Sequence, residues 1–258
     1  MKILLLTPAA CEPAVASALE RVERILMQSG HAVVMQIVND DLYSRVMDEK
    51  PDVVFNLASI FAWEKTGHIP AILEIAGVRY TGSGFLTLSL ARNPTKLLPL
   101  LESSGIAVPP YRILKAGEPV FSKTLHFPLR ICRDGFQPLP GVSGMHALKN
   151  VLGALPPQED LLLCENRQEA AVSVFILDSR IFPHKLAPAL QNCALSAYHL
   201  LEARGLVRFD FIQPGQPLLV NIEASPDPLG ASFLEAAAAA GLDEADVIRM
   251  IVEQAGCD

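Results

Sequence analysis

Two apolar segments near the C-terminal end, separated by a turn, constrain the fold of this chain most. The segments "LVRFDFI" (206–212) and "LLVNIEA" (218–224) flank "QPGQP", a pattern that predicts two antiparallel strands. Because side chains alternate along a strand, Arg208 and Asp210 share one face, and so do Asn221 and Glu223 on the next strand. Two carboxylates, an amide and a guanidinium are therefore expected at one point of a sheet.

Such a cluster has a chemical and a simpler interpretation. Neighbouring carboxylates repel each other unless a cation is present, and oxygen ligands suit Mg²⁺ held against phosphates. The simpler interpretation is a solvated sheet face, on which alternating polar residues are ordinary. The spacing favours a metal site, with Asp210, Asn221 and Glu223 as its ligands.

The remainder of the chain predicts an α/β fold. Within residues 1–78 the pattern predicts strands at 2–6, 32–38 and 51–58 and helices at 13–30 and 68–77, which is typical of a small parallel lobe. Further helices are expected at 85–91, 95–105, 143–153 and 187–203 and in the last part of the chain, and further strands at 111–114, 127–132, 161–166 and 169–177. We place the lobe boundaries to give 1–78, 79–165 and 166–258.

Charge and cysteine usage narrow the class of ligand and the compartment. A formal net charge of −7 and the absence of clustered Lys and Arg argue against nucleic-acid and membrane partners, so small ligands are expected. The five cysteines form no C-x-x-C pair, which indicates reduced thiols in a soluble cytoplasmic protein. They are Cys11, Cys132, Cys164, Cys193 and Cys257.

Several segments, in order, resemble the D-alanine–D-alanine ligases of the ATP-grasp superfamily. "GLVRFDFIQPGQPLLVNIEASPDP" resembles the end of their ATP-grasp domain, where an Arg-x-Asp strand and a Glu-x-Asn strand hold Mg²⁺ on the nucleotide phosphates. The segment 52–114, with its "YTGSG" turn, is similar to their stretch from the substrate lobe into the central lobe. The resemblance implies an ATP-grasp fold with an N-terminal parallel α/β lobe, a small central lobe and a C-terminal sheet lobe.

The resemblance also implies cofactors and roles for individual residues. It implies ATP and Mg²⁺, with Asp210, Asn221 and Glu223 on the metal and Arg208 stabilising a tetrahedral intermediate. It assigns the nucleotide to Arg92, Lys96, Arg130, Glu165 and Glu169, of which Glu169 opens "EAAVSVFIL" and would bind the ribose. The substrates would be a small carboxylate and an amine.

The nucleotide motifs depart from the family pattern. The metal strand has its order inverted, to Asn221-Ile222-Glu223. The family's phosphate-binding Lys falls on Cys132, so Arg130 or Arg133 would have to replace it. In the loop "DGFQPLPGVSG" (134–144), Pro138 and Pro140 remove two N–H donors, while Gly141 matches the family's Gly.

The substrate end is shortened as well. Only "DSRIFPHKLAP" spans the interval in which these ligases have a long loop with a Lys-Tyr pair. Glu12 lies close to the position of their ammonium-binding Glu but out of register, and Ala58 and Ser59 occupy the region of their substrate-lobe His. The substrate is therefore expected to differ from two D-alanines.

Two hypotheses follow. The chain is either an ATP-dependent carboxylate–amine ligase with an altered substrate, or a catalytically degenerate protein that acts as a binding or regulatory partner. Loss of several phosphate contacts together would be severe, because one such donor is worth about 10²–10³-fold in rate. A homodimer is what the resemblance implies, and a protein partner is what the second hypothesis implies.

Overall fold

The computed structural model describes residues 1–8, 13–61, 67–115, 118, 125–136, 138–155, 160–167, 169–183, 185–213 and 215–256. Glu12, Cys11 and Cys257, which the sequence singled out, lie outside these residues. The chain forms two compact units, one of Met1–Leu88, Val174–Arg208 and Glu223–Asp258 and the other of Ser89–Ser173 and Phe209–Ile222. The division into three lobes stays a prediction.

A parallel sheet begins the first unit, as expected. Its order is β2-β1-β3, and β1 pairs in parallel with both neighbours. The strands are β1 (Lys2–Thr7), β2 (Ala32–Ile37) and β3 (Val53–Asn56). The helices along this part of the chain are α1 (Pro13–Gln28), α2 (Leu42–Glu49), α3 (Ala58–Phe61), α4 (His68–Ile75) and α5 (Phe85–Ala91).

The central strand of this sheet is apolar on both faces because helices cover both. Ile3 and Leu5 pack into a cluster with Leu19, Val22 and Leu26 of α1. On the other face, Leu4 and Leu6 pack with residues of α2 and α4. An uninterrupted apolar run such as "ILLL" is typical of a parallel strand buried on two sides.

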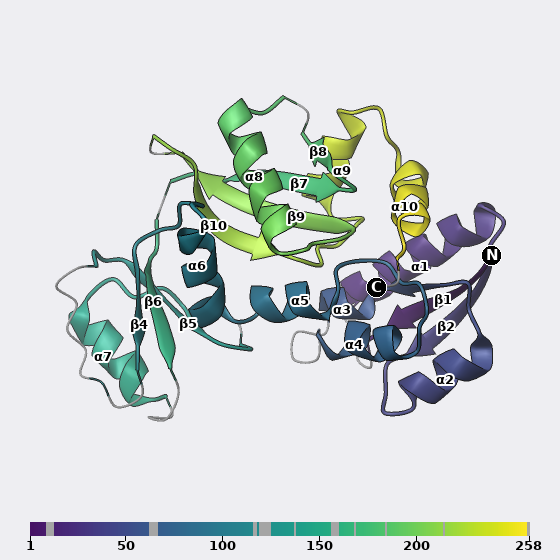
Figure 1. Ribbon diagram of the computed structural model, residues 1–258, viewed down its shortest axis with the longest axis horizontal. Coiled ribbons are helices and arrows are strands. Elements are labelled where there is room, and N and C mark those ends of the chain that lie inside the picture. The colour runs from purple at the N-terminus through teal and green to yellow at the C-terminus, as the bar shows by residue number, and fades with distance from the viewer. Residues whose placement is uncertain are drawn as a thin grey trace. The chain divides into compact units, whose positions relative to one another are not determined.

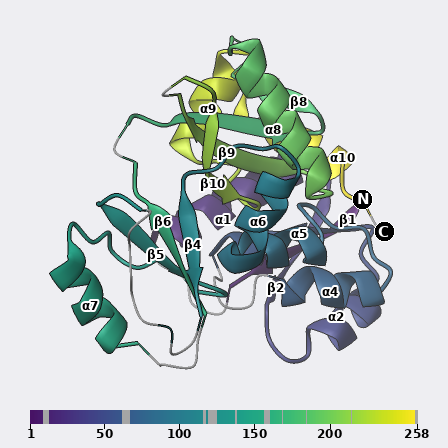
Figure 2. The same ribbon diagram turned by 60° about the vertical axis from the view of Figure 1, so that its left-hand side comes forward.

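An antiparallel sheet forms the centre of the second unit. Its order is β4-β6-β5, with β4 (Tyr111–Leu114), β5 (Leu129–Arg133) and β6 (Leu161–Glu165). Figure 1 shows α7 (Met145–Gly153) and α6 (Pro94–Ser103) on opposite sides of this sheet, and the turned view of Figure 2 agrees. Leu148 of α7 packs with Leu129 and Ile131, whereas Leu98 of α6 packs with Cys132 and Cys164. The two faces of β5 therefore have different neighbours.

The third sheet contains the strand pair from which the metal site was predicted. Its order is β10-β9-β7-β8; β7, β9 and β10 each have residues in both units, whereas β8 belongs to the first. The strands are β7 (Val172–Leu177), β8 (Arg180–Phe182), β9 (Leu206–Ile212) and β10 (Leu218–Glu223). The remaining helices are α8 (Pro188–Leu200), α9 (Ala231–Ala238) and α10 (Glu244–Glu253).

The sequence missed three short elements, α2, α3 and β8. Helix α2 buries only Leu42 and Val46, so its polar majority hides the helical period. Strand β8 has three residues and pairs with β7 inside the interval that the sequence left as a short loop. Among the described residues, no helix combines the length and the apolar character that crossing a membrane would need.

Candidate functional site

Asp210 on β9 is held by side chains from both neighbouring strands. It is 6% exposed. The Ser173 hydroxyl on β7 donates to its Oδ1 (2.7 Å), and the Asn221 amide on β10 donates to its Oδ2 (2.9 Å). The predicted approach of Asp210 and Asn221 is confirmed, and Ser173 is an additional partner that no sequence pattern indicated.

Arg208 and Glu223 also approach each other. The Arg208 Nη1 lies 3.8 Å from the Glu223 Oε2, and the guanidinium carbon of Arg208 lies 5.8 Å from the centre of the Phe175 ring. The side chains of Arg208 and Glu223 are 32% and 45% exposed. Solvent screening makes such a pair weak in stability terms, so its position suits contact with a ligand better than a structural role.

Oxygen donors of the types that suit a magnesium ion lie on β9 and β10. Asp210 and Asn221, which are hydrogen-bonded in the second unit, offer a carboxylate and an amide, and Glu223 of the first unit offers a second carboxylate. The described part of the chain contains no group of three or more His, Cys, Asp and Glu side chains arranged to hold a metal. A cation here would need Asn221 and oxygens of a ligand to complete its coordination, as Mg²⁺ sites built on substrate phosphates do. The assignment of the three residues as ligands stays a prediction.

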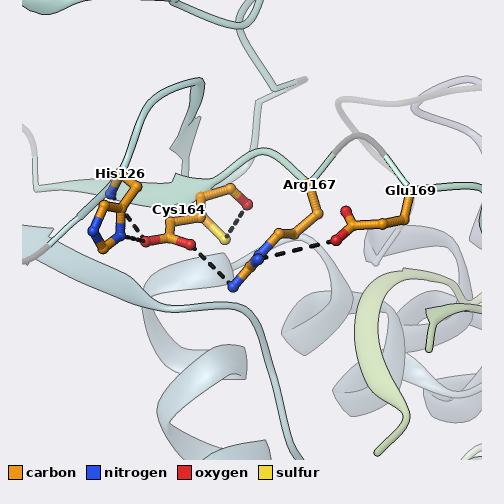
Figure 3. A network of polar contacts seen from close by, with 5 residues as sticks. His126, Cys164, Arg167 and Glu169 are labelled. Atoms are coloured by element: carbon orange, nitrogen blue, oxygen red, sulfur yellow. Dashed lines mark hydrogen bonds and ion pairs between the residues drawn. The ribbon is translucent and has the colours of Figure 1, made fainter. Parts of the chain in front are cut away.

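Glu165 and Glu169, the two predicted nucleotide-binding carboxylates, share one partner, Arg167. Arg167 Nη2 lies 3.2 Å from Glu165 Oε2, and Arg167 Nη1 lies 4.0 Å from Glu169 Oε1. Figure 3 shows the Arg167 side chain extending toward Glu169. On its other side, Glu165 Oε1 accepts a hydrogen bond from the His126 backbone N–H and lies 2.9 Å from His126 Nδ1. Arg167 was not predicted from the sequence, although its position two residues before Glu169 could have indicated it.

Glu165 stays ionised in this environment. Its side chain is 6% exposed. Burial tends to raise the pKa of the Glu165 carboxyl, but the His126 hydrogen bonds and the charge of Arg167 outweigh burial and bring the pKa below its usual range. A buried carboxylate at a strand end is suited to accept hydrogen bonds from a polar ligand.

The two arginines of β5 point to different environments. Arg130 lies opposite Cys164 in the strand register, on the face of Cys132, and its Nη2 donates to the Val220 backbone oxygen of β10 (3.0 Å). Arg133 is on the other face by alternation, and its guanidinium carbon stacks 4.0 Å from the centre of the Phe136 ring. Of the two arginines that could replace the lysine, only Arg130 shares the face of position 132.

The thiols beside Arg130 are buried and neutral. Cys132 and Cys164 are 5% and 1% exposed and are free cysteines. Burial raises the pKa of both thiols, that of Cys164 to about 11, although the Arg130 guanidinium opposes the shift. The two thiols therefore carry no charge beside the Arg130 guanidinium at neutral pH.

Four backbone N–H groups of the loop 134–144, which the resemblance assigns to the phosphates, already have acceptors within the protein. The N–H groups of Gly135, Phe136, Leu139 and Val142 bond to backbone oxygens of Arg92, Arg133, Ile131 and Leu129 respectively. Pro138 and Pro140 have no N–H to offer. Gly141 has a local reason to be glycine, because a Cβ there would lie 2.9 Å from Asn166 Nδ2.

Arg92 and Lys96 lie near the start of α6, beside this loop. The Arg92 backbone oxygen accepts from Gly135, and Asp134 accepts hydrogen bonds from the backbone N–H and the hydroxyl of Thr95. Lys96 is exposed one residue further on. Their roles toward a nucleotide stay predictions.

At the substrate end, Asn56 and Ser59 form hydrogen bonds with each other and with Thr81. The Asn56 amide donates to the Ser59 hydroxyl (2.7 Å), and the Asn56 backbone N–H donates to the Thr81 hydroxyl (3.0 Å). Asn56, Ser59 and Thr81 are all buried. In the region where these ligases have their substrate-lobe His, the polar groups of this chain therefore connect β3 to the "YTGSG" turn by hydrogen bonds.

Comparisons with known proteins agree on one family resemblance. The chain is 26% identical to the D-alanine–D-alanine ligase of Pelotomaculum thermopropionicum, over 92% of this chain and 90% of that one. It is 26% identical to the ligase of Moorella thermoacetica, over 88% and 89%. No protein-family model matches the chain.

A solved structure has the same fold. The D-alanine–D-alanine ligase from Bacillus anthracis, complexed with ATP, superposes with a TM-score of 0.86 at 18% identity, covering 98% of this chain and 96% of that chain. The ATP-grasp fold expected from the sequence is thereby confirmed. The chain therefore has the fold of a D-alanine–D-alanine ligase, and its sequence is similar to curated ligases over about nine-tenths of its length.

Proposed function

We propose that the chain is an ATP- and Mg²⁺-dependent ligase that joins a carboxylate to an amine. Asp210 carries the proposal, because it is a buried carboxylate fixed by Ser173 and Asn221, with two oxygen-bearing side chains on the adjacent strand. Asp210, Asn221 and Glu223 would hold Mg²⁺, which supplies charge neutralisation on the nucleotide phosphates. A site of this kind suits phosphoryl transfer, which depends mainly on positioning and electrostatics.

The proposed reaction has two steps. A carboxylate oxygen of the first substrate takes the terminal phosphoryl group of ATP, which leaves ADP and an acyl phosphate. The amine then attacks the acyl carbon, the phosphate leaves and the amine loses a proton, so that an amide forms. Arg208 would bind the oxygen that becomes negative during the attack, since a guanidinium stabilises such charge.

The proposed substrates are small molecules other than a pair of D-alanines. The support is the interval 178–188, which holds only the three-residue strand β8 where the resemblance implies a long loop. The polar groups of Asn56 and Ser59 are also directed to each other. We place the reaction in the cytoplasm, in agreement with the free buried thiols of Cys132 and Cys164. A homodimer or a protein partner stays part of this proposal.

Isothermal titration calorimetry with ATP and Mg²⁺ tests the function. We expect magnesium-dependent binding of ATP that is lost in Asp210→Ala/Glu223→Ala. The control is Glu20→Ala/Asp40→Ala, which removes the same charge from exposed positions of the first unit and should bind ATP like the wild type. Binding would justify a screen of carboxylates and amines by phosphate release. Absence of ATP binding by the wild type at millimolar concentration would refute the ligase.

One observation favours the second candidate, a degenerate protein that binds a partner. In the loop 134–144, four backbone N–H groups already have acceptors within the chain and two positions are prolines, so these six positions offer no free N–H to a phosphate. If ATP does not bind, a pull-down under native conditions with the intact chain becomes the appropriate experiment.

A further inference from the structure

Strand β5 presents a cation to the face on which the family resemblance expects one, but from a different position. Arg130 and Cys132 are two residues apart, so both side chains lie on the face that packs against α6. The side chain of Cys132 is short, buried and neutral. A guanidinium extends farther from its Cα than a thiol does, so the charge of Arg130 can reach a ligand that contacts this face of β5.

The contacts of Arg130 fix its guanidinium near the candidate cation site. Its Nη2 donates to the oxygen of Val220 (3.0 Å), and Val220 immediately precedes Asn221, whose amide donates to Asp210 (2.9 Å). Arg130, Asn221 and Asp210 all belong to the second unit. The hydrogen bond from Arg130 to the Val220 oxygen therefore joins the guanidinium on β5 to β10, the strand that carries the proposed metal ligand Asn221.

One donor atom of Arg130, Nε, is left without an acceptor in the described part of the chain. The Nε atom is buried and has no hydrogen-bond partner among the described residues. Buried donors without a partner are rare in native proteins, and a bound ligand is one group that can satisfy them. The neighbouring thiols do not neutralise the guanidinium, because burial raises their pKa and keeps them uncharged at neutral pH.

We propose that Arg130 binds the nucleotide phosphates in place of the lysine that the family has at position 132. This inference rests on the proposed function and adds to it the residue that replaces the lost charge. Arg133 is not that residue, because it lies on the opposite face and stacks on Phe136. The chain would thus have moved a positive charge two residues along one strand without moving it to another face.

Calorimetry with two ligands tests the assignment. ATP with Mg²⁺ and adenosine are titrated into the wild type, Arg130→Met, the matched control Arg133→Met, and the rescue variant Arg130→Met/Cys132→Lys. We expect Arg130→Met to weaken ATP binding about 10–100-fold, the usual effect of losing a hydrogen bond to a charged group, and to leave adenosine binding unchanged. Arg133→Met should behave like the wild type, and the lysine at position 132 should restore much of the ATP affinity.

Each contrary result has a distinct meaning. If Arg130→Met binds ATP like the wild type, the inference is wrong while the proposed function stands. If it loses adenosine as well and melts at a lower temperature, Arg130 is structural and the inference is also wrong. If the wild type binds no ATP, the proposed function fails and the inference with it. Should Arg130→Met not fold, Arg130→Gln replaces it, and an ATP affinity equal to that of the wild type would then overturn the assignment.

Discussion

Two regions that follow strands of the β4-β6-β5 sheet differ in how they could bind a nucleotide. After β6, charged side chains interact with one another: Glu165, Arg167 and Glu169 form a chain of ion pairs, with His126 at one end. After β5, the loop 134–144 is held by bonds between backbone groups, and its prolines remove donors. The two regions therefore differ in the groups that a ligand would meet, which are charged side chains after β6 and backbone groups that already have partners after β5.

This difference separates two kinds of binding energy. Backbone donors that already have partners inside the protein gain little from a ligand, because a hydrogen bond must be broken for each one formed. Charged side chains at a strand end can exchange a protein partner for a ligand at lower cost when they are partly exposed. We therefore expect nucleotide affinity in this chain to depend on single side chains.

The largest effect is expected from removing the buried carboxylate of the first region. Glu165→Ala leaves the His126 N–H without its acceptor and leaves Arg167 with the longer contact to Glu169, so the free energy of unfolding should fall by about 1–3 kcal/mol. Adenosine binding should weaken in parallel. Urea unfolding and calorimetry measure the two quantities. Glu169→Ala is the control, because Glu169 is 45% exposed and lies 4.0 Å from Arg167; an equal loss in both variants would contradict a special role of Glu165.

A smaller effect of opposite sign is expected in the second region. Replacing Pro138 and Pro140 by Ser returns two N–H donors to the loop, so ATP binding should strengthen by up to about tenfold, the gain from one ordinary hydrogen bond. Adenosine binding should not change. The measurement is the ratio of the two dissociation constants in the variant and the wild type. A ratio that stays constant would mean that the loop does not face the phosphates.

The pH dependence of stability sharpens the description of Glu165. Its pKa is lower in the folded protein than the ordinary 4.5, so its ionised form stabilises the fold above that pH. This contribution is lost as the pH falls through the folded-state pKa. The difference in unfolding free energy between the wild type and Glu165→Gln should therefore be constant from pH 7 down to about 5 and shrink below that. A difference that grows on acidification would show that the folded pKa is raised.

The smallest effect is expected at the exposed aromatic ring of the second region. Phe136 is 48% exposed and stacks with Arg133. Phe136→Ala should cost at most about 0.5–1 kcal/mol of stability, the value of an exposed cation–π contact. ATP affinity should stay at the wild-type value, because the stack lies on the face opposite Arg130. A loss of ATP binding would place the ring at the nucleotide instead.

Local patterns predicted most of the fold. The strands of both units and the long helices follow from apolar periodicity, and the approach of Asp210 to Asn221 follows from the two-residue repeat of paired strands. The elements that were missed are short, and the periodicity signal needs several turns or several alternations to emerge. Ser173 was missed because strand order, not spacing along the chain, brings it to Asp210.

The sequence by itself determined the class of fold, the family resemblance, the carboxylates of the candidate metal site and the loss of the lysine at position 132. Only the tertiary structure decided between Arg130 and Arg133, because strand register and the helices on either face of the sheet fix which side each guanidinium occupies. It also decided that four backbone N–H groups of the loop 134–144 bond to backbone oxygens of the same chain. A sequence gives the number of hydrogen-bonding groups, whereas their partners are set by segments distant along the chain, which only folding brings within reach.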